Sequence, residues 1–278
     1  GGAACGPKWE LMPKNDPRPA FLIVNGDESE PGTFKDRQIF QYDPHLLIEG
    51  IICTCYAINA HHAYIYIRGE YKFFSDRVNV AIKEAYEAGI IGDKIMNKYD
   101  FKLDITLHRG GGAYICGEKS ALIESLEGKR GHPRLKPHGK ECEWFFDNPA
   151  TVNNVETIAS VPNIVENGAE GYTKYGTPKS PGTMLFAISG PVKNPGVYEM
   201  AYGNKMIDFL NILGGGMIEG KKLKAIIPGG SSCPILTAEE VEKAVLDYES
   251  MWDIGSTLGT GGMIVIDEDT SMVDVAKN

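Results

Sequence analysis

The chain has 278 residues and a formal net charge of −9; 42% of its residues are hydrophobic and 23% are charged. So acidic a balance excludes a broad nucleic-acid interface, because little positive charge remains to neutralise phosphates. No apolar run approaches the roughly 20 residues that span a bilayer, which favours a soluble protein or a peripheral subunit with room for two domains.

The first half of the chain alternates predicted strands with predicted helices. Strands are predicted over 20–25, 62–69 and 101–109, and helices over 44–60, 71–89 and 121–128. This alternation is typical of an α/β domain with a largely parallel sheet. Ligands in such sheets bind beside the carboxyl ends of the strands. The loops over 25–37 and 110–120 follow two of these strands and are the candidate binding loops.

The second half has a different pattern. Residues 148–172 predict another helix that is entered from a loop, and beyond about residue 175 short strands gather around one short helix. A hairpin is predicted over 182–200, a short helix over 206–215, and strands over 223–234 and 263–268. This arrangement favours a small α+β module of the β-grasp type.

The glycine loop GGGAYICGEKS over 110–120 resembles a phosphate-binding loop. Strand, glycines and helix in this order present backbone N–H groups to an anion. Gly112 and Gly117 have the spacing of a nucleotide P-loop, but Glu118 stands before Lys119 and Ser120. A carboxylate at that point would repel a triphosphate. A P-loop-like NTPase is therefore only a remote alternative.

The loop NGDESEPGTFKDR over 25–37 gathers acidic residues directly after a buried strand. A solvated acidic turn and a Mg²⁺ site are two possible interpretations. The third is that these carboxylates accept hydrogen bonds from ribityl or ribose hydroxyls and a ring N–H, which suits a flavin or nicotinamide ligand. The six cysteines are irregularly spaced and contain no C-x-x-C pair, so they indicate no disulfide framework, zinc site or iron–sulfur site.

Several longer motifs carry a family resemblance. The stretches GGAA, NGDESEPGTFKDR, RGGGAYICGE, PRLKP, TVNNVET, SGPVKNPGVYE and IPGGSS occur in this order. In this the chain resembles the NADH-binding flavoprotein subunit of respiratory complex I and the related subunits of NAD-linked hydrogenases and formate dehydrogenases. The resemblance implies a Rossmann-like FMN-binding domain over 1–174 and a β-grasp, soluble-ligand-binding domain over 175–268. It also implies that 269–278 begins a helical iron–sulfur domain.

The same resemblance implies an activity. In the family, NADH passes a hydride to FMN, and electrons then go singly to iron–sulfur clusters and, in NADH:quinone oxidoreductase, on to quinone. The flavin supplies this chemistry, so no catalytic side chain is expected. The cysteine set that holds a [4Fe–4S] cluster in full-length members does not occur here, and this chain is expected to hold no metal itself. Expected partners are an iron–sulfur subunit and others, peripheral to a bacterial inner membrane on its cytoplasmic face or to the mitochondrial inner membrane on its matrix side.

The resemblance also implies which residues bind the ligands, because each motif of the family has matching positions in this chain. The expected FMN contacts are Gly1, Gly2, Lys8, Asn25, Asp27, Glu28, Gly117, Glu118, Asn153 and Asn154. The expected NADH contacts are Glu30, Tyr114, Lys119 and Lys136. The resemblance implies that Tyr114 packs on a ring of the dinucleotide and that Lys136 pairs with one of its phosphates.

Three departures from the family pattern bear on the dinucleotide. Lys119 stands where the family has a second glutamate, Cys5–Gly6–Pro7 replaces a longer N-terminal turn, and residues 138–141 replace Pro-Phe-Pro-Ala. A cation beside the adenosine ribose favours a 2′-phosphate, where a carboxylate would repel it. The sequence thus leaves open a homologue shifted towards NADPH, a non-catalytic homologue that keeps FMN, and a Lys119 that is simply a surface lysine.

Overall fold

The computed structural model describes residues 5–135 and 142–277, which form two compact units. The first unit holds the residues up to 29 together with 36–166, and the second holds Glu30–Lys35 together with the residues from 167 onwards. The division falls at residue 166, whereas the sequence suggested 174. The segment Glu30–Lys35 also leaves the first unit for the second, because its backbone bonds and packs there.

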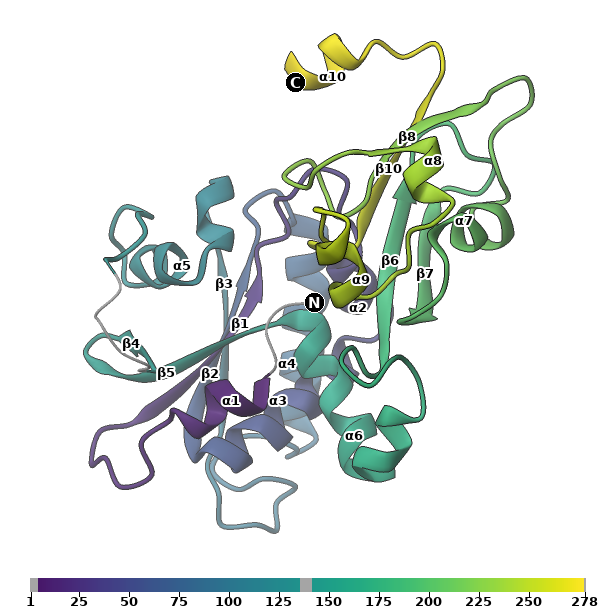
Figure 1. Cartoon of the computed structure of the whole chain (residues 1–278). Helices are drawn as coiled ribbons and strands as arrows, with labels where there is room; N and C mark the ends of the chain where they lie inside the picture. The colour runs from purple at the N-terminus through teal and green to yellow at the C-terminus, as the bar shows by residue number, and fades with distance from the viewer. Residues whose placement is uncertain (1–4, 136–141, 278) are drawn as a thin grey trace. The chain divides into compact units, whose positions relative to one another are not determined.

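The first unit is built on a five-stranded sheet in the order β3-β2-β1-β5-β4 (Figure 1). The strands β1 (Ala20–Gly26), β2 (Ala60–Ile67), β3 (Asp104–Arg109) and β5 (Asn148–Asn154) pair in parallel, and β4 (Glu143–Phe145) is an antiparallel edge strand. The predicted α/β domain with a largely parallel sheet is confirmed. Parallel pairing brings the carboxyl ends of β1, β3 and β5 to the same edge.

Helices cover both faces of this sheet. The alternation of β1 sends Leu22 and Val24 into a core shared with α3 (Pro44–Ile58), α4 (Lys72–Glu87) and the start of α6 (Val155–Thr173). Ile23 points the other way, into a core that it shares with α5 (Lys119–Leu126). A strand buried on both faces reads as a continuous apolar run, which is the pattern of AFLIV.

Helix α3 has clear end signals and one close contact. Asp43 caps its first turn by accepting from the N–H of Leu46 at 3.1 Å, and Asn59 ends it in the left-handed conformation, at φ 54°. Gly50 lies where α3 meets α6: a Cβ placed on it would stand 2.0 Å from the carbonyl oxygen of Ile158. Only glycine permits this approach of the two helices.

The stretch 148–154 differs from the prediction, since it forms β5 and not a loop before a helix. Its sequence NPATVNN contains a proline and three asparagines, which are poor strand formers, but five of its residues are buried between β1 and β4. Tertiary burial therefore decides its conformation. Two short helices, α1 (Cys5–Glu10) and α2 (Asp36–Tyr42), were also not predicted.

The second unit contains a mixed five-stranded sheet in the order β7-β6-β10-β8-β9. The predicted hairpin is formed by β6 (Thr183–Ser189) and β7 (Gly196–Ala201), and the last strand, β10 (Gly262–Asp267), pairs in parallel with β6. The strands β8 (Leu223–Ile227) and β9 (Leu236–Thr237) complete the sheet. This is the predicted β-grasp module.

The helices of the second unit are short. Met206–Asp208 (α7) continues into a π-helical turn over Phe209–Leu213, and Ala238–Val241 (α8) and Tyr248–Asp253 (α9) follow. Side chains from these helices and from β6 and β10 form the core of the unit, with Phe186 and Phe209 among its largest members. The last helix among the described residues is α10 (Met272–Lys277).

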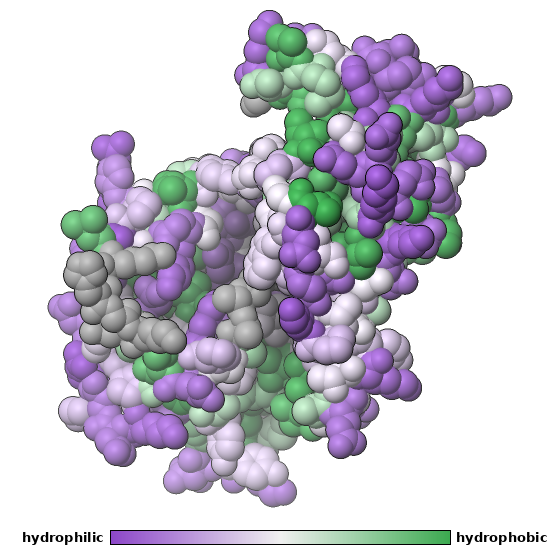
Figure 2. All heavy atoms as spheres, viewed as in Figure 1, coloured by the Kyte–Doolittle hydropathy of each residue, from purple (hydrophilic) through white to green (hydrophobic). Residues whose placement is uncertain are grey.

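Hydrophilic residues cover much of the visible face of each unit in Figure 2. Over the residues that the structure describes, no helix combines the length and apolarity that crossing a membrane requires.

Candidate functional site

The two asparagines that end β1 and β5 meet at the carboxyl edge of the first sheet. Asn25 and Asn154 are direct partners in the parallel register. Asn25 donates through Nδ2 to the carbonyl oxygen of Gly117 at 2.9 Å, and Asn154 donates through Nδ2 to Asp36 at 2.8 Å. The structure thus brings the glycine loop, β1 and β5 together through side-chain amides.

Glu118 has a defined local role in the glycine loop. The loop forms a short 3₁₀ turn over Tyr114–Gly117, and Glu118 is the N-cap of α5. Its Oε2 accepts from the backbone N–H groups of Ser120 at 3.0 Å and Ala121 at 2.9 Å, and from Ser120 Oγ at 2.6 Å. The first-turn donors that a P-loop offers to phosphate are therefore occupied by the chain's own carboxylate.

Asp27 follows β1 directly and lies beside the glycine loop, since a Cβ placed on Gly117 would stand 3.5 Å from its carbonyl oxygen. Its backbone N–H donates to Asn25 Oδ1 at 3.1 Å, and its carboxylate accepts from Ser29 Oγ. Burial is the main influence on this group and raises the pKa of the Asp27 carboxyl, against the opposing effects of Ser29 and Arg68. A half-buried carboxylate with a raised pKa suits a site where a ligand supplies further hydrogen bonds.

The raised pKa predicts a specific effect of pH on stability. Between the unfolded pKa, near 3.8, and the higher folded pKa, the folded state binds more protons. The free energy of unfolding therefore falls as pH rises through this window, and the cost is fully present above the folded pKa. We expect Asp27→Asn to raise the Tm of the flavin-free protein at pH 7, with the gain vanishing near pH 4.

Thermal melts over this pH range measure the effect, with Asp93→Asn as the control because the Asp93 side chain is 93% exposed. Equal Tm values for Asp27→Asn and the unaltered protein at pH 7 would contradict the prediction.

Glu28 is buried at the start of the loop that follows β1, and its carboxylate bonds to the residues at the end of that loop. Its carboxylate accepts from the backbone N–H of Asp36 at 2.7 Å, from Arg37 Nε at 3.2 Å and from the Tyr71 hydroxyl at 3.0 Å. Its carbonyl oxygen accepts from Arg68 at 3.1 Å. These hydrogen bonds join Glu28, which comes before the segment Glu30–Lys35, to residues that come after it. No motif in the sequence signals this use of Glu28.

Helix α1 lies against β5 through two polar side chains. Lys8 donates from Nζ to the carbonyl oxygen of Val152 at 3.1 Å, and Trp9 donates from Nε1 to Asn153 Oδ1 at 3.2 Å. Burial, followed by the charge of Lys119, lowers the pKa of Lys8. The predicted residues Lys8 and Asn153 thus belong to one cluster of side chains. Trp9 is a further member of this cluster that motif matching missed.

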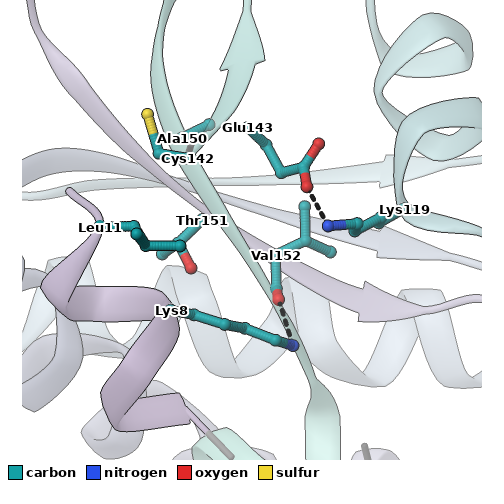
Figure 3. A pocket seen from close by; sticks show the side chains of 8 residues that line it. All are labelled: Lys8, Leu11, Lys119, Cys142, Glu143, Ala150, Thr151 and Val152. Carbon is teal, nitrogen blue, oxygen red and sulfur yellow. Dashed lines mark hydrogen bonds and ion pairs between the residues drawn. The ribbon is translucent and has the colours of Figure 1, made fainter. Parts of the chain in front are cut away.

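A pocket of about 50 Å³ opens between α1, β4, β5 and α5, and Lys8 and Lys119 both line it (Figure 3). The Lys119 ammonium forms an ion pair with the carboxylate of Glu143, the first residue of β4. Since Glu143 neutralises Lys119, this position offers less net positive charge than the sequence suggested. The ion pair is partly exposed, so it contributes little to stability by itself.

The predicted dinucleotide residues lie in different parts of the chain. Glu30 belongs to the second unit, where its Oε1 accepts from the backbone N–H of Ser232 at 2.7 Å. Tyr114 is exposed at the start of the 3₁₀ turn. Gly1, Gly2 and Lys136 lie outside the described residues.

Arg134, in the motif PRLKP, is another residue that motif matching did not assign. Its guanidinium donates to Glu124 and to Glu127 beside α5 and to the carbonyl oxygen of Trp144. Its backbone N–H donates to Ser120 Oγ at 2.9 Å. These bonds fix the chain just before residue 136 to the helix that follows the glycine loop. The only sign of this role in the sequence was that Arg134 stands two residues before Lys136, the residue expected to pair with a phosphate.

The fold and the edge constellation define a class: a doubly wound parallel-sheet domain with polar loops at its carboxyl edge, joined in one chain to a β-grasp module. The chain belongs to the family of the Nuo51 FMN-binding domain, whose model matches residues 1–163. Residues 184–266 match the SLBB domain.

Named relatives match nearly the whole of this chain. The chain is 48% identical over 274 residues to the F subunit of NADH-quinone oxidoreductase in Rhodobacter capsulatus, covering 98% of this chain and 63% of that protein. It is also 48% identical over 273 residues to the corresponding protein of Rickettsia bellii, of which it covers 65%. A crystal structure of an NAD⁺-reducing [NiFe]-hydrogenase matches with a TM-score of 0.85 and 35% identity, over 96% of this chain and 44% of that one. The chain thus spans less than two thirds of these relatives.

Proposed function

We propose that this chain is the FMN- and NADH-binding part of a flavoprotein subunit of a complex I-type NADH:quinone oxidoreductase. The observation that carries the proposal is the set of amides and carboxylates at the carboxyl ends of β1 and β5, in a member of the Nuo51 FMN-binding family. The identity of 48% to the NADH-quinone oxidoreductase protein of Rhodobacter capsulatus supports it.

One buried hydrogen-bond donor without a partner among the described residues shows how the site fits FMN. Asn153 is 1% exposed, and its Nδ2 has no hydrogen-bond partner among the described residues. A buried donor without an acceptor costs free energy, so such atoms are rare unless a ligand or water completes them. FMN carries carbonyl, ring-nitrogen, hydroxyl and phosphate acceptors. The donor set at this edge therefore fits the cofactor.

The residues of the chain would bind and orient the cofactor. FMN, when bound, supplies acceptance of a hydride and release of single electrons. Asn25, Asn153 and Asn154 offer amide groups, Asp27 offers a carboxylate to hydroxyl groups, and Lys8 offers positive charge. We assign no side chain as a proton donor or acceptor.

Glu28 would act on the cofactor indirectly. Its carboxylate bonds to Asp36, Arg37 and Tyr71, and these bonds hold the shape of the loop that follows β1. The loop in turn carries Asp27, whose carboxylate would meet the cofactor. Glu28 is therefore proposed to support the binding loop from within.

The capped start of α5 argues against nucleoside triphosphate binding. Glu118 occupies the N–H groups of Ser120 and Ala121, where a triphosphate would need them free. The bond from Asn25 to the carbonyl oxygen of Gly117 instead holds the glycine loop against β1, where it would serve as a binding loop for a flavin or dinucleotide.

Partners follow from the same proposal. An iron–sulfur subunit would receive the electrons, and further subunits would hold the chain at the bacterial inner membrane on the cytoplasmic side or at the mitochondrial inner membrane on the matrix side. A [4Fe–4S] cluster is expected in full-length members of the family.

A visible-light titration tests the function. FMN is added to the purified chain, unbound flavin is removed, and NADH and then NADPH are added to separate anaerobic samples. Retained flavin absorption that bleaches with NADH is the expected result. No retained flavin would refute FMN binding. Retained flavin that neither dinucleotide bleaches would favour the non-catalytic homologue.

The ion pair between Lys119 and Glu143 predicts the choice of dinucleotide. Because Glu143 neutralises Lys119, we expect the unaltered chain to reduce its flavin faster with NADH than with NADPH. Glu143→Gln frees the ammonium and is expected to narrow this difference several-fold, with Glu87→Gln as the exposed control. Stopped-flow rates with both dinucleotides measure it, and a preference of the unaltered chain for NADPH would contradict it.

A further inference from the structure

The carboxamide of Asn153 has one end bonded and one end open. Its Oδ1 accepts from Trp9 Nε1 at 3.2 Å and from Thr151 Oγ1 at 3.4 Å, whereas Nδ2 has no partner among the described residues. An indole N–H can only donate, so it must face the oxygen of the amide. Trp9 therefore determines which end of Asn153 is the oxygen and which is the free donor.

Trp9 is itself held in place. It lies on α1, packs against the main core of the first unit, and is partly buried. The neighbouring Lys8 attaches the same helix to the carbonyl oxygen of Val152, one residue before Asn153. A rotation of the amide by 180° would set two donors, Nδ2 and the indole N–H, against each other, so the observed orientation is the stable one.

We propose that Trp9 is a positioning residue for FMN: it holds Asn153 so that the buried Nδ2 donates to an acceptor atom of the cofactor. This inference rests on the proposed function and adds a residue that the motif comparison does not assign. Without the indole N–H, the amide can turn, and the cofactor meets a donor that is correctly placed for only part of the time. The loss appears in FMN affinity, in addition to the small loss of stability that removing one buried hydrogen bond brings.

FMN titration of the flavin-free protein tests this role through the quenching of flavin fluorescence. Trp9→Phe keeps an aromatic ring in the core and removes the N–H, and is expected to raise the Kd for FMN roughly tenfold, the worth of one hydrogen bond. Asn153→Asp keeps the shape but removes the donor, and should raise the Kd at least as much. Trp252→Phe, on a 65% exposed residue of the second unit, is the matched control and should leave the Kd unchanged.

A double-mutant cycle separates positioning from simple packing. If Trp9 acts through Asn153, Trp9→Phe in the Asn153→Asp background should change the Kd by less than about twofold. A merely structural Trp9 would lower affinity by the same factor in both backgrounds. That result would overturn the inference, as would an unchanged Kd for Trp9→Phe.

A second measurement keeps Trp9 in place, and so covers the case in which Trp9→Phe does not fold. The chain has three tryptophans, so Trp144→Phe and Trp252→Phe identify the indole N–H signal of Trp9 by elimination. Slow hydrogen exchange of this signal, slowed further by FMN, is expected; fast exchange in both states would overturn the inference. Failure of the unaltered protein to bind FMN would refute the proposed function itself, whereas binding with an unaffected Trp9→Phe refutes only the positioning role.

Discussion

Replacing Glu28 with alanine is expected to lower the free energy of unfolding of the first unit by about 3 kcal/mol, the range for breaking a buried ion pair. The Glu28 side chain is 1% exposed, and its carboxylate accepts from Asp36, Arg37 and Tyr71. Alanine removes the acceptor of all these donor groups at once and also opens a cavity. Glu28→Gln keeps the volume and one oxygen acceptor, so its loss should be smaller.

Urea unfolding can report on the first unit alone. Two of the three tryptophans, Trp9 and Trp144, lie in the first unit, so fluorescence in a Trp252→Phe background follows that unit. Glu87→Ala is the control, because that side chain is 65% exposed and its ion pair with Lys83 contributes little. A Glu28→Ala protein as stable as this control would show that the buried carboxylate does not stabilise the loop. FMN affinity should fall with stability in the order glutamate, glutamine, alanine.

Gly50→Ala is expected to be the second severe substitution, again by about 3 kcal/mol. In an open helix, alanine would stabilise the chain by about 1 kcal/mol relative to glycine. Here its Cβ would stand 2.0 Å from the carbonyl oxygen of Ile158, and backbone atoms at this distance cannot move aside cheaply. Helices α3 and α6 must separate, which loosens the core that both share with β1.

Gly6→Ala is the matched control for Gly50→Ala. Gly6 is also helical, but a Cβ placed on it meets no atom within 4 Å. The same urea measurement should show a neutral or slightly stabilised Gly6→Ala protein. If both variants had equal stability, the close approach of α3 and α6 would not be a tight contact in solution.

The strands and helices with strong periodicity were predictable from the sequence. AFLIVN and HAYIYIRG carry continuous apolar runs, and both became central strands. The strand β5 was not predictable, because its asparagines disfavour a strand and only burial between neighbouring strands imposes one. The segment Glu30–Lys35 could not be assigned to the second unit either, since its partners lie about 200 residues further along the chain.

The candidate site was predictable in its location and less so in its bonding. Loops after parallel strands pointed to the carboxyl edge, and the structure brings Asn25, Gly117 and Asn154 together there. The inward bonding of Glu28 and Glu118 could not be read from a linear motif, because both carboxylates bind backbone N–H groups whose direction depends on the folded loops.

The charge of Lys119 shows the same limit at a single residue. Its partner Glu143 lies on a separate strand, β4, and no motif links the two positions. Only the folded chain places the two side chains together, so the sequence alone overstated the positive charge at this point of the site.

The excursion of Glu30–Lys35 has a consequence for dissecting the protein. Its backbone contributes to the second unit: Pro31 accepts from the N–H of Ser231 at 3.1 Å, and a Cβ on Gly32 would lie 2.7 Å from Ile264. Within residues 5–135 and 142–277, the polypeptide therefore passes between the units at three points and not at one. A fragment that begins at residue 167 would lack part of its own structure. The two modules are thus interleaved along the chain, and a single cut between them would not separate one complete module from the other.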